Sequence, residues 1–127
     1  MRYSLLLHYP EMSADELGPE ALAEGMRAFD DYAKALDAAG VLVSAEVLQP
    51  ASATTTITLA TGELVVQDGP FADTAEKLGG VVVIDVGDLD AALEWAERAP
   101  SAYYGHVEIR PTATRFVDGE WTAFDHH

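Results

Sequence analysis

The sequence of 127 residues contains no cysteine and few basic residues, with seven Lys and Arg against 22 Asp and Glu. The absence of cysteine excludes disulfides and thiolate chemistry. A formal net charge of −15 argues against a nucleic-acid or anionic-membrane surface, because phosphate binding needs clustered Lys and Arg. Acidic surfaces of this kind keep small proteins apart in solution without specifying a partner.

Long apolar runs and cofactor motifs are also missing. No segment reaches the roughly 18–20 apolar residues that span a bilayer, and the N-terminus lacks a small-residue cleavage site. We therefore expect a cytoplasmic protein with no membrane partner. Without His-x-His, HExxH or a Gly-rich phosphate loop, we expect no metal and no organic cofactor. The terminal His126 and His127 receive no functional role.

The most distinctive segment is the tetrapeptide DGPF at Asp68–Phe71, which follows a predicted strand. Gly69 tolerates backbone angles that are barred to other residues, and Pro70 fixes its own φ. We expect Phe71 to be buried and to anchor the turn in apolar surroundings. The turn would hold Asp68 at a strand end, either as a functional carboxylate or as a turn residue that accepts backbone hydrogen bonds.

With this segment, four further blocks in the same order resemble the YCII-related, or DGPF-domain, family of small bacterial proteins. These blocks are Arg2–Leu7, Gly40–Pro50, Asp88–Ala92 and Tyr104–Pro111. The resemblance implies a dimeric α-β barrel, in which two sheets meet. It also implies a catalytic histidine–aspartate pair, which maps onto His8 and Asp68. Because the family's activity is largely unassigned, the resemblance says more about fold than about function.

The chain length fits one domain over residues 1–127, with residues 112–127 as a C-terminal tail. Apolar periodicity predicts strands over 2–9, 41–48, 54–60, 63–67, 81–84 and 104–110, and helices over 19–39 and 89–99. A tight hairpin at Thr61–Gly62 joins the third and fourth strands, and the tail holds a short strand around 114–117. The expected inner stripes of the helices are Leu22, Met26, Phe29, Ala33 and Leu36 in the first, and Leu89, Leu93 and Ala96 in the second.

This order predicts an α+β fold, a ferredoxin-like βαββαβ sandwich with an inserted β-hairpin. Two helices cover only one face of such a sheet, so the other face must meet water or a partner. The apolar run Val81–Ile84 can bury both faces of its strand, which requires cover on the side without helices. We therefore expect a homodimer of the dimeric α-β barrel type, joined through the helix-free face.

Strand alternation places several polar side chains on the helix-free side, where a barrel would have its cavity. His106, Glu108 and Arg110 share one face of the last strand, and Glu46 shares a face with Ser44. We consider Glu46, His106, Glu108 and Arg110 as substrate-binding residues, with Arg110 as a carboxylate anchor. The last-strand residues could instead form a ladder of compensating charges or face the dimer partner.

His8 is the candidate for proton transfer, because imidazole is the side chain whose proton affinity is closest to neutrality. Asp68 would orient His8 and stabilise its cation. The alternative is that His8 is an exposed histidine at a strand end. Close approach of His8 and Asp68 in a cleft would favour chemistry, and separate exposure to water would not.

Two classes of function remain open. The first is a cofactor-independent small-molecule binding protein or enzyme that takes a carboxylated or phenolic ligand in a barrel cavity. Its proton transfer would serve an isomerase- or lyase-like step. The second is a non-catalytic regulatory or binding module. For this second class the family resemblance implies a link to sigma factors of the extracytoplasmic-function type.

Overall fold

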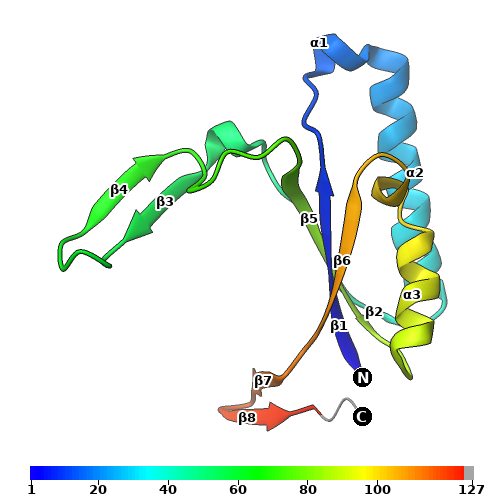
Figure 1. Cartoon of the computed structure of the whole chain (residues 1–127). Coiled ribbons are helices and arrows are strands. Elements are labelled where there is room, and N and C mark those ends of the chain that lie inside the picture. The colour runs from blue at the N-terminus through cyan, green and yellow to red at the C-terminus, as the bar shows by residue number, and fades with distance from the viewer. Residues whose placement is uncertain (125–127) are drawn as a thin grey trace.

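Four strands form the central sheet: β1 (Arg2–Tyr9), β2 (Leu42–Val47), β5 (Lys77–Asp85) and β6 (His106–Pro111). All neighbouring strands are antiparallel, in the order β2-β5-β1-β6 (Figure 1). The structure is a computed structural model and describes residues 1–124. Two hairpins lie outside this sheet: β3 (Thr55–Thr58) with β4 (Val65–Asp68), and β7 (Thr114–Val117) with β8 (Glu120–Ala123).

The helices are α1 (Ala14–Leu17), α2 (Pro19–Ala38) and α3 (Leu89–Glu97), with 3₁₀ turns at Ala51–Ala53 and Pro100–Tyr103. Helices α2 and α3 cover one face of the sheet, and both hairpins project away from them (Figure 1). The predicted α+β class and the inserted hairpin are confirmed, and the strand order is compatible with a ferredoxin-like fold. The dimer and the barrel stay predictions.

Local sequence signals explain where the helices begin. Ser13 and Glu16 form the capping box of α1, since each side chain accepts a hydrogen bond from the other residue's backbone N–H. Pro19 opens α2, where its missing N–H costs nothing. The Asp88 carboxylate accepts a hydrogen bond of 2.9 Å from the Ala91 N–H and caps α3.

The hydrophobic core lies between the helices and the sheet. Its buried residues are Tyr3, Leu5 and Leu7 of β1, Val82 and Ile84 of β5, Tyr32 and Leu36 of α2, Ala92 and Ala96 of α3, together with Val86 and Ala99. The inner stripe expected for α3 is partly wrong, because Leu89 and Leu93 are half exposed. The small side chains of Ala92 and Ala96 face the core instead, at a helical spacing of four.

The hairpins differ from the prediction in detail. Thr58 lies opposite Val65, so the connection between β3 and β4 spans residues 59–64 rather than a two-residue turn at Thr61–Gly62. The tail contributes the expected strand at 114–117 and a second strand, β8, which pairs with it. His126 and His127 lie outside the described residues. None of the helices within residues 1–124 combines the length and apolar character that a bilayer-spanning helix needs.

Candidate functional site

The end of β1 carries the candidate histidine on the face of the sheet that the helices leave open. The buried side chains of β1 point toward the helices, so His8 alternates to the opposite face. Across the pairing with β6, His8 lies opposite His106 and Leu6 lies opposite Glu108. Polar side chains of β1 and β6 therefore share the helix-free face, as expected from strand alternation.

His8 contacts Glu108, which lies diagonally across from it. His8 Nε2 and Glu108 Oε1 are 2.6 Å apart. Nε2 is buried and has no aligned hydrogen-bond acceptor within residues 1–124, so the contact is an ion pair when His8 is protonated, not a straight hydrogen bond. Glu108 thus holds the position beside the imidazole that the sequence analysis gave to Asp68.

His106 pairs with Glu76, which immediately precedes β5. His106 Nδ1 lies 2.8 Å from Oε1 and 3.1 Å from Oε2 of the Glu76 carboxylate. This hydrogen bond and the charge of the carboxylate raise the pKa of His106 above its ordinary value. Each histidine of the site therefore has its own carboxylate, and we refer to His8, Glu108, His106 and Glu76 as the His8 cluster.

The other two predicted substrate-binding residues, Arg110 and Glu46, lie apart from each other. Arg110 lies opposite Ser4 on the helix-free face and forms no ion pair within residues 1–124, so its guanidinium is open to a ligand. Glu46 lies opposite Val81, with β5 and β1 between it and β6. Three strand spacings of about 4.8 Å separate β2 from β6 by about 14 Å. Glu46 is therefore outside the His8 cluster.

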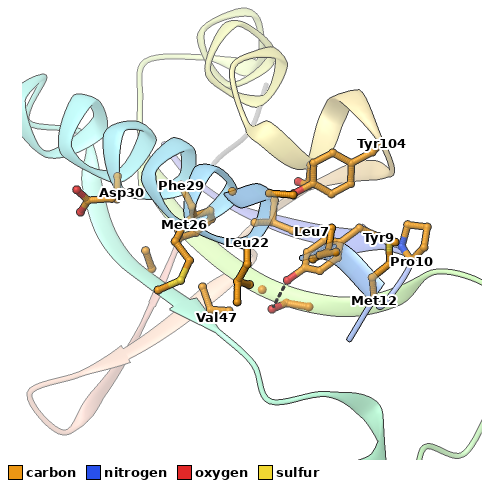
Figure 2. Close-up of a pocket in the computed structure, with 18 residues that line it drawn as sticks. Leu7, Tyr9, Pro10, Met12, Leu22, Met26, Phe29, Asp30, Val47 and Tyr104 are labelled. Carbon is orange, nitrogen blue, oxygen red and sulfur yellow. Dashed lines mark hydrogen bonds between the residues drawn. The ribbon is translucent and has the colours of Figure 1, made fainter. Parts of the chain in front are cut away.

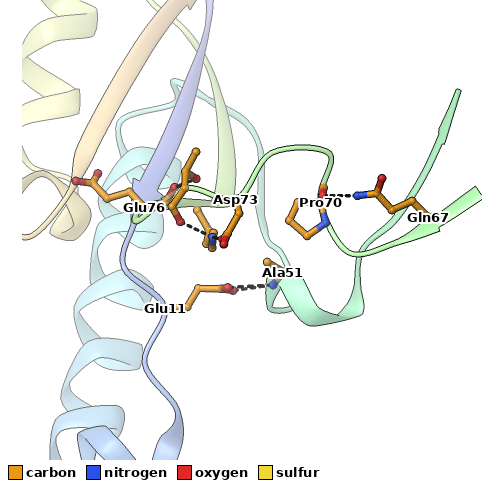
Figure 3. Close-up of polar contacts among 8 residues, drawn as sticks. Glu11, Ala51, Gln67, Pro70, Asp73 and Glu76 are labelled. Atoms are coloured by element: carbon orange, nitrogen blue, oxygen red, sulfur yellow. Dashed lines mark hydrogen bonds and ion pairs between the residues drawn. The ribbon is translucent and has the colours of Figure 1, made fainter. Parts of the chain in front are cut away.

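The DGPF segment leaves β4 in a turn held by groups other than the Asp68 carboxylate. Gly69 adopts a φ of 97°, a conformation that favours glycine, and its N–H donates to the Thr54 carbonyl at 2.7 Å. Gln67 Nε2 donates to the Pro70 carbonyl at 2.9 Å (Figure 3). The Asp68 carboxylate is exposed and has no hydrogen bond or ion pair within residues 1–124. Its pairing with His8 therefore stays a prediction.

Phe71 is 87% exposed, so the expectation that it is buried in its own chain is wrong. The physical reason is its location. The core lies on the helix side of the sheet, whereas the loop that carries Phe71 lies on the side of the projecting hairpin (Figure 1). An aromatic ring at this position has no core surface of the same chain to pack against.

Two polar contacts hold two segments in place beside the sheet (Figure 3). One joins the loop after the DGPF segment to the start of β5, and the other joins the 3₁₀ turn Ala51–Ala53 to the segment that follows β1. Lys77 Nζ lies 2.6 Å from Asp73 Oδ1, and this hydrogen bond lowers the pKa of Asp73. The Ala51 N–H donates to the Glu11 carboxylate at 2.8 Å. The walls around His8 therefore come from three segments that are distant in sequence.

These segments border a half-open cavity of about 480 Å³ with His8 on its lining. Pro70, Phe71, Glu76 and Lys77 also line it. The volume falls within the range of small-molecule sites, about 300–1,000 Å³. No trio of His, Asp or Glu side chains within the described chain is arranged to hold a metal ion. The arrangement suits proton transfer between an imidazole and a small ligand.

Sequence reasoning missed the carboxylates that the structure brings to the histidines. Glu108 was considered as a ligand-binding residue, as part of a charge ladder along its own strand, or as facing a dimer partner, and not as the partner of His8, although its register diagonal to His8 follows once β1 and β6 are known to pair. Glu76 belongs to the segment of the DGPF resemblance, but it lies 30 positions from its partner His106. No local signal predicts such a pairing, because it depends on the path of the loop in space.

The fold and the His8 cluster define a small α+β domain with a histidine-containing cavity beside a DGPF loop. Residues 1–115 match the YCII-related domain family. The chain is also 34% identical over 115 residues to an uncharacterized protein of Rhizobium meliloti (strain 1021), covering 89% of this chain and 93% of that protein. The chain belongs to the YCII-related domain family.

Proposed function

We propose that the chain binds a small carboxylated or phenolic molecule beside His8, and that His8 transfers a proton to or from it. The observation that carries this proposal is the 2.6 Å contact of His8 Nε2 with Glu108 Oε1 beside a cavity of about 480 Å³. A general base near neutral pH needs both an available imidazole and a fixed ring orientation. Glu108 supplies the orientation, and the reaction class is isomerase- or lyase-like.

Two further groups enter the proposal from outside the cavity lining. Arg110 lies opposite Ser4, four residues and about 13 Å along β1 from His8, so it would bind the carboxylate of a ligand that extends along the sheet beyond the cavity. Asp68 is the second proton-transfer residue of the proposal, since its carboxylate is exposed at the start of the loop that lines the cavity.

The test has two stages. A library of small carboxylic acids and phenols is screened by thermal shift, because a ligand at 100 times its Kd stabilises the native state by about 2.7 kcal/mol. Each hit is then incubated with the protein in D₂O, and exchange of its acidic C–H protons is followed by ¹H NMR. We expect at least one hit whose proton exchange is accelerated by the protein.

Substitutions then assign the roles. His8→Gln should slow exchange by about 100- to 10,000-fold while the thermal shift remains, since a proton-transfer group contributes this much to rate. Glu108→Gln and Asp68→Asn distinguish which carboxylate assists His8, and Glu20→Gln, exposed at the start of α2, serves as the control. Exchange that is unchanged in His8→Gln, or a library without hits, would contradict the proposal.

The second candidate is a non-catalytic binding module, and one observation favours it. The β3–β4 hairpin and the DGPF loop expose apolar side chains, among them Ile57, Val66 and Phe71. Such surfaces are typical of association with another protein. Hits that shift the melting temperature without any accelerated exchange would favour this candidate over the enzyme.

A further inference from the structure

A second cavity lies on the opposite side of the sheet from His8, between the N-terminal half of α2 and strands β1, β2 and β5 (Figure 2). Its volume is about 890 Å³, near the upper end of the range for small-molecule sites. Leu22, Met26 and Phe29 of α2 form one wall. Leu7, Ala45 and Val47 of the sheet form the other.

A small residue on the helix wall contributes to this space. Helix α2 packs tightly at its C-terminal half, where Tyr32 and Leu36 are buried. Toward its N-terminus Gly25 lines the cavity, and a Cβ built there would meet no atom within 4 Å. On the sheet, the position beside Gly79 is filled by the Tyr9 ring, so the open space lies on the helix side of the cavity.

One polar side chain in the lining is left without a partner. Ser101 is only 3% exposed, and its Oγ has no hydrogen-bond partner within the described chain. A buried hydroxyl without a partner is unfavourable, and such groups are nearly always hydrogen-bonded in native proteins. Because Ser101 Oγ itself has almost no exposed surface, a ligand atom can pair with it only when the Ser101 side chain rotates toward the cavity, and such a pairing would remove this cost.

Tyr9 gives the cavity a second polar group. Its hydroxyl donates a hydrogen bond of 3.1 Å to the Gly79 carbonyl, and its ring packs edge-on against Tyr104 with the centroids 5.9 Å apart. Burial raises the pKa of Tyr9, so the phenol stays protonated at neutral pH. Its oxygen lone pairs remain available to a ligand donor.

Charge decides what kind of ligand fits. Asp30 is the one charged residue in this lining among the described residues, and its carboxylate is held 2.7 Å from Lys34 Nζ. An anionic ligand would find no cation in the cavity, and the chain as a whole carries a charge of −15. Burying an unpaired charge is costly. The cavity therefore selects against fatty acids and other carboxylates.

We propose that this cavity binds a neutral apolar molecule with a single hydroxyl or carbonyl group, which forms a hydrogen bond with Ser101 Oγ. Met26, Phe29 and Tyr104 contact the apolar body of the ligand in this half-open cavity, and the flexible thioether of Met26 lets the wall adapt to its shape. This site is independent of the proposed function of His8, because the two cavities lie on opposite faces of the sheet.

The experiment uses N-phenyl-1-naphthylamine, a neutral probe that fluoresces in apolar sites. The full chain should give a saturable rise in fluorescence, which 1-decanol reverses. Decanoate should compete at least about tenfold more weakly, because its carboxylate finds no counterion. Ser101→Ala should weaken 1-decanol about three- to tenfold, the effect of one lost hydrogen bond, and change probe affinity less than twofold.

Gly25→Leu provides the cavity-filling variant. Leu is a better helix former than Gly, so the fold should be kept, and its side chain enters space that is empty in the native chain. We expect loss of binding for both the probe and 1-decanol. Ala28→Leu, on an exposed part of α2 outside the cavity lining, is the matched control and should bind normally.

Four outcomes would overturn the proposal. The first is the absence of saturable probe binding, and the second is full binding by Gly25→Leu. The third is equal competition by 1-decanol and decanoate, and the fourth is unchanged 1-decanol affinity in Ser101→Ala. Either of the last two would refute recognition of a neutral polar group. Because none of these variants touches the His8 cluster, failure here is distinguishable from failure of the proton-transfer proposal.

Discussion

Two glycines allow the chain to pack closely at the end of β1. A Cβ at Gly105 would overlap the carbonyl oxygen of His8, and a Cβ at Gly79 would overlap the ring of Tyr9. The reason for glycine here is close approach of the backbone, not a left-handed φ. The same two positions set the place of His8 on one face of the sheet and of Tyr9 on the other.

The close approach at Gly105 gives the first prediction. Gly105→Ala must displace the β1 backbone at His8, so we expect a loss of about 1–3 kcal/mol in the free energy of unfolding. Urea denaturation followed by circular dichroism measures it. Gly87→Ala is the matched control, because a Cβ there meets no atom within 4 Å. Equal stabilities of the two variants would contradict the packing argument.

Single residues also show where sequence reasoning ends. The positive φ of Gly69 could be predicted from local chemistry, since the four residues Asp68–Phe71 contain the Gly-Pro pair that is typical of a turn. The exposure of Phe71 and the partner of His8 do not, because they depend on which distant segments share a face. Sequence singled out His8 and the last-strand polar residues as candidates, but register across β1 and β6 was needed to pair His8 with Glu108.

The two main helices differ in how well their patterns predicted their packing. The predicted stripe of α2 is confirmed only toward its C-terminal end, where Leu36 is buried and Phe29 is partly buried, whereas Leu22 and Met26 are exposed at the open cavity. For α3 the larger apolar residues, Leu89 and Leu93, predicted an inner face that is half exposed in the structure. Periodicity reports a direction around the helix axis, but the distance from helix to sheet decides whether Leu or Ala fits at the contact.

Helices α2 and α3 are joined by a partly buried hydrogen bond, which gives the second prediction. Tyr32 Oη donates to the Trp95 carbonyl at 2.8 Å, and burial raises the pKa of Tyr32 to about 12. Tyr32→Phe keeps the ring and removes the bond, so it should cost about 0.5–1.5 kcal/mol of unfolding free energy. Denaturant titration tests this, with exposed Tyr103→Phe as control. No difference between them would contradict a structural role for the hydroxyl.

The order of strands and helices across the chain was the most predictable feature, because turns, caps and apolar periods agree with one another along the sequence.

The oligomeric state is harder to predict from sequence than the order of elements, since it depends on which surfaces are apolar rather than on local patterns. Leu6, Val81 and Val83 form an apolar centre on the helix-free face of the sheet. The β3–β4 hairpin projects beside this face, and a two-stranded hairpin is at best marginally stable alone.

These surfaces lead to the third prediction, that two copies associate through the helix-free face. Light scattering after size exclusion, at about 10 µM chain, should give twice the 13.6 kDa mass of one chain. Val83→Glu places two like charges in the middle of an apolar contact and should yield monomers, because an unpaired buried charge is costly. Leu93→Glu, a half-exposed apolar position on α3, should remain dimeric. A wild-type monomer, or equal effects of the two substitutions, would show that the helix-free face meets water and that the hairpin needs another partner.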